Sequence, residues 1–264
     1  MKKTFIIKPE NNFTDFVEFA SQENIDGVEL LIMKPTKADT FSDLAERKRI
    51  LEANGVGVSA VSIWHYGLAD PAGGLSSEMI KRGIDYAGEI GADCFYTGPG
   101  EPDCDNPTAA LADCYDEWES LVKQQGMELA VYLGHEGSYI RSEAMLADAI
   151  DAVPNLGLKI DPQGLIRNLA VDYPNGPCDI LYRFGANLTF FHVKGLSRHR
   201  DGELEPPPLM DKLPWGEMFG IMLEHEYDGW VSSEPHGDYW DEPANLRKAY
   251  IRHTFRMLEP FMAN

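Results

Sequence analysis

The chain has 264 residues, of which 44% are hydrophobic and 25% charged, a composition typical of a folded, enzyme-sized domain. Its 43 acidic and 23 basic residues give a net charge of −20. This balance argues against nucleic acid and anionic membranes as partners, because binding phosphate groups requires clusters of Lys and Arg.

The N-terminus and the cysteines bear on where the protein is located. The segment Met1–Lys8 starts with basic residues, but its apolar run stops after three residues, too short for a signal peptide. No stretch approaches the roughly 20 apolar residues of a membrane span. The four cysteines show no CxxC spacing and are interpreted as reduced thiols. We therefore expect a soluble, cytoplasmic protein.

Short apolar runs alternate with longer segments of helical spacing along the whole chain. Eight such runs predict strands, at residues 4–8, 27–32, 57–63, 93–97, 128–133, 156–160, 188–193 and 229–233. They are mostly apolar without alternation, as strands buried on both faces are. Between them, apolar residues recur three and four positions apart, which predicts amphipathic helices. The last helix is expected to bury Leu246, Tyr250, Met257, Leu258 and Phe261.

Eight strand–helix units in 264 residues average 33 residues each, the size of a βα repeat. This repeat predicts one domain over residues 1–264, an α/β protein folded as a closed (β/α)8 barrel. A doubly wound open sheet is the competitor, but Ile7–Glu10 follows the first strand in place of its glycine-rich turn. Residues 196–213, with three consecutive prolines, are predicted to form the one long irregular connection, a candidate lid or binding loop.

Polar residues gather at the ends of the last four predicted strands, where barrels of this kind place their active sites. They are His135 and Glu136 after the fifth strand, Asp161 after the sixth, His192 and Lys194 around the end of the seventh, and Glu234 and His236 after the eighth. Carboxylates gathered in one cavity resist joint ionisation unless a cation offsets their charge. Carboxylate oxygens with an imidazole suit one divalent ion, and Mn²⁺, Mg²⁺, Fe²⁺, Co²⁺ and Zn²⁺ are not distinguished.

The chain resembles the xylose isomerase-like superfamily of barrels, which holds sugar isomerases and epimerases, inosose dehydratase and an endonuclease branch. The resemblance is strongest in Lys159–Asp161, Phe191–Lys194 and Tyr227–Glu234, and it includes Asp26–Leu30 at the second strand. It implies that Asp161, His192 and Glu234 bind one divalent metal.

The fourth metal ligand of the family departs from the pattern. Where the family has a Glu in the fifth strand, this chain has Tyr132 or Leu133, depending on the alignment. Glu136 is expected to supply the missing ligand, with His135 as the next candidate. In addition, Gly164 and Gly195 replace a His and an Asp that are common after strands six and seven.

The resemblance implies an isomerase or epimerase that moves a proton next to the carbonyl of a ketose or related polyol ketone, a small-molecule sugar or polyol substrate. Glu234 is expected to act as metal ligand and base, with Glu136 as its partner and His65 as a donor to a substrate hydroxyl. The expected substrate-binding residues are Lys194, His135, His236, Trp64 and Trp240.

Two alternatives stay open. An inosose dehydratase-like lyase would use the same metal and base, and the segment Val131–Gly137 resembles that enzyme at its Val-Tyr, His and Gly positions. A non-catalytic sugar-binding barrel with a degenerate metal site would account for the missing Glu. The endonuclease branch is disfavoured by the charge of −20 and by the lack of its multi-histidine cluster. The sequence leaves open the substrate, the metal and whether a homo-oligomer forms.

Overall fold

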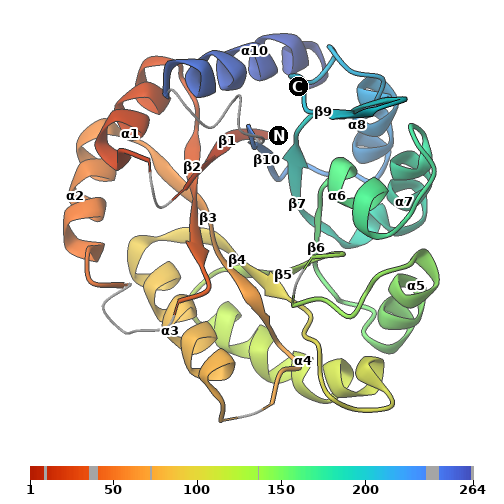
Figure 1. Cartoon of the computed structure of the whole chain (residues 1–264). Coiled ribbons are helices and arrows are strands. Elements are labelled where there is room, and N and C mark those ends of the chain that lie inside the picture. The colour runs from red at the N-terminus through yellow and green to blue at the C-terminus, as the bar shows by residue number, and fades with distance from the viewer. Residues whose placement is uncertain (9–10, 36–40, 72, 136, 236–243, 263–264) are drawn as a thin grey trace.

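Parallel strands form a closed barrel that is surrounded by helices (Figure 1). The computed structural model describes residues 1–8, 11–35, 41–71, 73–135, 137–235 and 244–262. Around the barrel the strand order is β1-β10-β7-β6-β5-β4-β3-β2. These strands are β1 (Lys2–Ile7), β2 (Gly27–Met33), β3 (Gly57–Gly67), β4 (Ala92–Gly98), β5 (Glu128–Tyr132), β6 (Leu158–Ile160), β7 (Leu188–Val193) and β10 (Trp230–Ser233). The (β/α)8 barrel predicted from the sequence is confirmed.

The helices follow the strands in chain order and cover the outside of the barrel (Figure 1). They are α1 (Phe13–Gln22), α2 (Leu44–Asn54), α3 (Leu75–Ile90), α4 (Pro107–Gln124), α5 (Glu143–Ala152), α6 (Pro162–Asn168), α7 (Gly176–Phe184), α8 (Trp215–Glu224) and α10 (Ala244–Met262). None of these helices within the described ranges is long and apolar enough to cross a membrane.

Two sequence-based expectations about elements were wrong. The connection 196–213 contains an antiparallel hairpin of β8 (Ser197–His199) and β9 (Gly202–Leu204), in which Arg198 pairs with Glu203. This hairpin is polar and largely exposed, so it lacks the apolar pattern that reveals a strand. In α10, Met257 is 42% exposed because it lies at the edge of the buried stripe, whereas Arg247 is buried within that stripe.

Alternate strand residues fill the inside of the barrel, as the two-residue period of a strand requires. This interior cluster consists of Ala60, Cys94, Tyr96, Ala130, Tyr132, Phe190 and Trp230, with Trp64 packed against it. The outward side chains pack against the helices, as Phe5 of β1 does against Phe16 and Phe19 of α1. The barrel interior is thus largely apolar, and the polar strand residues of the candidate site lie at its carboxyl end.

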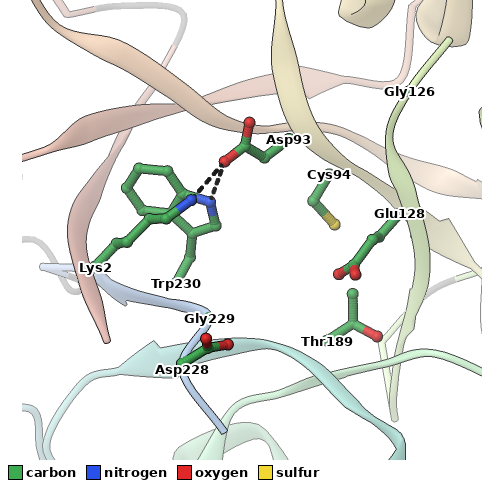
Figure 2. A pocket seen from close by; sticks show the side chains of 9 residues that line it. All are labelled: Lys2, Asp93, Cys94, Gly126, Glu128, Thr189, Asp228, Gly229 and Trp230. Atoms are coloured by element: carbon green, nitrogen blue, oxygen red, sulfur yellow. Dashed lines mark hydrogen bonds and ion pairs between the residues drawn. The ribbon is translucent and has the colours of Figure 1, made fainter.

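A cavity of about 330 Å³ lies at the opposite, amino end of the strands (Figure 2). It is lined by Lys2, Asp93, Cys94, Gly126, Glu128, Thr189, Asp228, Gly229 and Trp230. The Asp93 carboxylate accepts hydrogen bonds from Lys2 Nζ and Trp230 Nε1, both at 3.0 Å. In barrels of this type the amino end serves stability rather than chemistry, so the active site is expected at the other end.

Candidate active site at the carboxyl ends of the strands

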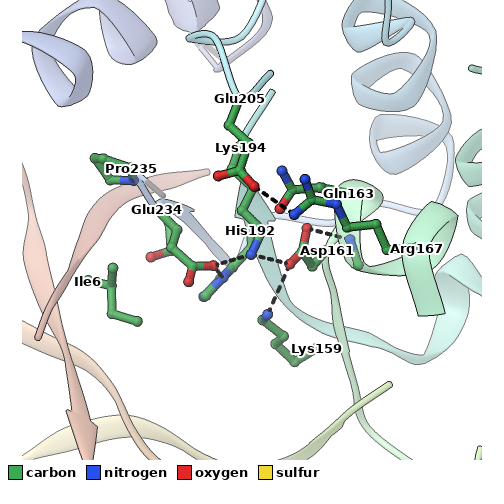
Figure 3. Close-up of polar contacts among 12 residues, drawn as sticks. Ile6, Lys159, Asp161, Gln163, Arg167, His192, Lys194, Glu205, Glu234 and Pro235 are labelled. Atoms are coloured by element: carbon green, nitrogen blue, oxygen red, sulfur yellow. Dashed lines mark hydrogen bonds and ion pairs between the residues drawn. The ribbon is translucent and has the colours of Figure 1, made fainter. Parts of the chain in front are cut away.

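Asp161, His192 and Glu234 come together at the carboxyl ends of β6, β7 and β10 (Figure 3). One ligand atom from each lies within 4.8 Å of the others, and all three residues are buried. Strand geometry explains the convergence. His192 lies two residues after the inward-facing Phe190 and so shares its face. The Glu234 N–H donates to Val193 O at 3.1 Å, which keeps the end of β10 beside β7.

The two carboxylate oxygens of Asp161 have different partners. Oδ1 accepts a hydrogen bond from Gly164 N at 3.1 Å, so Asp161 is the N-cap of α6. Oδ2 lies 2.9 Å from Lys194 Nζ and 3.7 Å from Lys159 Nζ. Burial opposes ionisation of Asp161, but the two ammonium groups outweigh it and hold its pKa below the ordinary value.

Glu29 of β2 fixes the imidazole of His192. His192 Nε2 lies 2.8 Å from Glu29 Oε2, while Nδ1 lies 2.8 Å from Glu234 Oε2. The Ser232 hydroxyl donates to Glu29 Oε2 at 2.6 Å, and the Tyr96 hydroxyl also donates to this carboxylate. Burial opposes the ionisation of Glu29, but these contacts outweigh it and its pKa is lowered.

Glu29 is a site residue that sequence reasoning missed. It appeared there only as part of the segment Asp26–Leu30 that carries the family resemblance. The available signal was a single charged residue inside the apolar run of the second strand. Full burial of such a residue requires partners, and the partners come from other strands.

Lys194 joins two of the expected metal ligands. Its Nζ lies 2.9 Å from Asp161 Oδ2 and 2.9 Å from Glu234 Oε2 (Figure 3). Burial opposes the charged form of Lys194, but these carboxylates outweigh it and raise its pKa. In turn, Lys194 and His192 overcome the effect of burial on Glu234 and hold its pKa well below the ordinary value. Lys194 is therefore a buried ion-pair partner of Asp161 and Glu234. Its position after a strand in the sequence did not reveal these ion pairs.

Lys159 of β6 is a second buried lysine of the site. Its Nζ lies over the rings of Trp64 and Tyr96, 5.5 Å and 5.9 Å from their centroids. Within the described part of the chain this nitrogen has no hydrogen-bond partner. Burial lowers the pKa of Lys159. Its only sequence signal was a lysine in an otherwise apolar strand.

His135 lies beside the cluster and fills the space next to Gly164. A methyl group added at Gly164 would lie 3.2 Å from Asp161 Oδ2 and 3.3 Å from His135 Nε2. The ring of His135 packs against Trp64 and Tyr132, with centroid distances of 4.8 and 5.9 Å. Burial, with help from nearby ammonium groups, lowers the pKa of His135 to about 4. Its imidazole is therefore neutral at pH 7 and can act as an acceptor or a ligand.

The remaining predicted residues differ in where they lie. Trp64 stacks on Tyr132 at 5.0 Å between ring centroids, inside the barrel. Tyr132, rather than Leu133, is thus the inward-facing residue at the end of β5. His65 has a φ of 68° near the end of β3, and its backbone N–H donates to the Tyr132 hydroxyl at 3.1 Å. Glu136, His236 and Trp240 lie outside the described residues.

The family model for the xylose isomerase-like TIM barrel matches residues 17–260. The chain belongs to this family. The match confirms the family resemblance that the sequence indicated. A search of curated protein sequences found no match to the chain.

Several solved structures have the same fold. D-psicose 3-epimerase with D-tagatose, from Clostridium cellulolyticum H10, superposes with a TM-score of 0.74 at 14% identity, covering 99% of each chain. The probable 3-DHS dehydratase AsbF from Bacillus anthracis gives 0.71 at 15% identity, covering 98% of this chain and 99% of that one. The IOLI protein with a bound zinc atom gives 0.76 at 14% identity, covering 100% and 98%. At these identities the likeness establishes the fold.

The described residues of the site fit a divalent metal ion. Two carboxylates and one imidazole supply oxygen and nitrogen donors that are close enough to share one ion. Behind the imidazole, the Glu29 carboxylate holds His192 Nε2 and leaves Nδ1 on the side of Glu234. Metal-binding histidines are typically supported in this way by a second carboxylate.

Proposed function

We propose that the protein is a divalent-metal-dependent isomerase or epimerase that transfers a proton next to the carbonyl of a ketose or related polyol ketone. The observation that carries this proposal is the buried convergence of Asp161, His192 and Glu234 in a chain of this family. The three residues would hold the metal. When bound, the metal would supply positive charge that stabilises the negative charge developing on the substrate oxygens.

Glu234 is the proposed base of the reaction. Cationic groups at the site outweigh the effect of burial and keep its carboxylate ionised, so it can accept a proton. Epimerisation also requires a group on the other face of the substrate, and Glu136 or His135 is proposed for it. His135 is favoured by its unpartnered, buried Nε2 beside Gly164, within the described residues. His65, Trp64, Lys194, His236 and Trp240 are proposed to contact the substrate.

The test is proton exchange at the carbon next to the carbonyl. The protein with Mn²⁺ is incubated in D₂O with D-fructose, D-psicose or D-tagatose, and deuterium incorporation is followed by NMR. We expect exchange with formation of the epimer or isomer. In Glu234→Gln the rate should fall at least about a hundredfold, because the base is lost.

Glu128→Gln is the matched control, since Glu128 lies at the amino end of β5 in the cavity of Figure 2. This variant should keep the wild-type rate. The proposal is wrong if the protein binds no divalent metal and Glu234→Gln turns over every substrate of the panel as fast as the wild type.

A lyase is the second candidate, favoured by the Val131–Gly137 segment that resembles inosose dehydratase. The same base would remove a proton beside the carbonyl, and water would leave from the next carbon. Mass spectrometry separates the two reactions, because dehydration lowers the product mass by one water and epimerisation leaves it unchanged.

A further inference from the structure

Lys194 lies between two of the residues that are proposed to hold the metal. Its ammonium nitrogen is 2.9 Å from Asp161 Oδ2 and 2.9 Å from Glu234 Oε2, two of the three proposed ligand residues. A divalent ion bound to the same oxygens would lie about 2.0–2.6 Å from them. The two cations would then stand within a few ångströms of each other in a buried site, where their repulsion is strong.

The buried charges around Lys194 explain the role of its ammonium group. Glu29, Asp161 and Glu234 are all buried, and Asp161 and Glu234 face each other across the site. Glu29 has its own partners in His192, Ser232 and Tyr96. Among the ion pairs of the described residues, those of Lys194 join Asp161 and Glu234 to the same cation. Without a cation here, two buried carboxylates would repel each other at high cost.

We propose that Lys194 is a built-in cation that holds the metal position in the metal-free protein and leaves it when a divalent ion binds. Lys194 follows directly on β7, which carries His192, and its ammonium is at the end of a flexible four-carbon side chain that can change conformation. The displaced ammonium is then free to donate a hydrogen bond to a substrate oxygen. This inference rests on the proposed function, since it concerns the same metal site.

The inference is tested by isothermal titration calorimetry with Mn²⁺ on the full chain. Lys194→Met removes the competing cation, so Mn²⁺ should bind at least about tenfold more tightly than to the wild type. Differential scanning calorimetry gives a second readout. Without metal, Lys194→Met should have a lower melting temperature than the wild type. Adding Mn²⁺ should raise the melting temperature of Lys194→Met by more than it raises that of the wild type.

Lys159→Met is the matched control. It removes an equally buried ammonium that approaches Asp161 at 3.7 Å, and no described ion pair links it to Glu234. Its gain in Mn²⁺ affinity should be well below that of Lys194→Met. Equal gains would show a general effect of charge and would overturn the exchange. If Lys194→Met does not fold without metal, Lys194→Gln, which keeps hydrogen-bond donors, replaces it in both measurements.

The outcomes separate this inference from the proposed function. Unchanged or weaker Mn²⁺ binding by the Lys194 variants, or no binding by any variant, overturns the role of Lys194. If Lys194→Met binds Mn²⁺ and the wild type does not, the role of Lys194 is supported. The same result contradicts a metal-dependent reaction of the wild type. Epimerisation by EDTA-treated wild type contradicts the metal dependence alone, and the calorimetry still decides on Lys194.

Discussion

The carboxylate of Glu29 holds the ring of His192 from the side opposite to Glu234. Both His192 nitrogens lie 2.8 Å from a carboxylate oxygen, one from each of these residues. Burial opposes a charge on this ring, but the two carboxylates outweigh it and raise the pKa of His192. The orientation of the imidazole is therefore set by β2, a strand that contributes no expected metal ligand.

Glu29→Gln tests this positioning role. The amide keeps the shape of the side chain but removes the charge that fixes His192. We expect Mn²⁺ affinity to fall about 10- to 100-fold, the usual effect of losing such a supporting group. Calorimetric titration measures it, with Ser232→Ala as the control that removes one neutral donor to Glu29. If Glu29→Gln binds Mn²⁺ like the wild type, Glu29 does not position His192.

The sequence predicts site residues that follow strand ends, and it misses those defined by contacts between strands. Asp161, His192 and Glu234 could be placed because the carboxyl ends of barrel strands converge. Glu29 and Lys159 lie within apolar strands, and their roles depend on partners distant in the sequence. The ion pairs of Lys194 likewise depend on side-chain conformations that strand alternation does not define.

At the scale of elements, the β8–β9 hairpin is attached to α6, the helix whose N-cap is Asp161. Arg167 of α6 donates to Glu203 at 2.8 Å and to Glu205 at 2.6 Å, and Arg198 donates to Glu203 at 2.6 Å. Figure 3 places Arg167 and Glu205 beside the site. Because the hairpin is mostly polar and exposed, we infer that these ion pairs contribute much of the interaction between the hairpin and α6.

Arg167→Gln should loosen the hairpin without unfolding the barrel. We expect faster amide hydrogen exchange in residues 197–204, measured by mass spectrometry, and a loss of overall stability below about 1 kcal/mol, as for exposed ion pairs. Acid should act in the same way. Burial opposes ionisation of Glu203, but its two arginines lower its pKa, so their contribution is present above the ordinary pKa of 4.5 and is lost as pH falls through the lowered value.

The matched control is Arg82→Gln, which removes an exposed ion pair with Glu78 on α3, far along the chain from the hairpin. It should leave exchange in residues 197–204 unchanged. Unchanged exchange in Arg167→Gln at neutral pH would contradict the attachment.

The barrel strands were predicted more accurately than the features that join them. The bounds of β7 match the expectation, because it is an apolar run ended by polar residues. In contrast, Arg247 of α10 has an unexpected role. Its buried guanidinium donates to Ile6 O at 2.9 Å and Pro235 O at 3.2 Å, which links the ends of β1 and β10. A charged residue in a helix is ordinarily assigned to the exposed face, so periodicity could not reveal this contact.

At the scale of the whole molecule, the net charge of −20 separates into two parts. Among the described residues, the buried acidic side chains are Glu29, Asp161 and Glu234, all of them at the site. The other described acidic side chains are at least partly exposed. In the described part of the chain, most of the acidic charge therefore lies at the surface, while the few interior carboxylates have cationic or hydrogen-bonding partners.

Surface repulsion predicts that salt stabilises the protein. Raising ionic strength from 0.01 to 1 M shortens the screening distance from about 30 to about 3 Å. The melting temperature should rise by roughly 2–4 °C for each 1 kcal/mol of repulsion removed. Sodium and potassium chloride should give the same rise in calorimetry, because screening depends on ionic strength. A melting temperature that falls with either salt would show that attractive ion pairs dominate the surface.

The two oxygens of the Asp161 carboxylate have different roles, and this affects what a mutation at this position would do. One oxygen caps α6 through Gly164 N, and the other faces the cation position. Asparagine can provide the capping oxygen but not the negative charge. The substitution Asp161→Asn would therefore keep the helix start and lose the hold on a cation. A single substitution at this position would thus separate the two roles of the side chain, because the capping oxygen would remain while the charge that faces the cation would be lost.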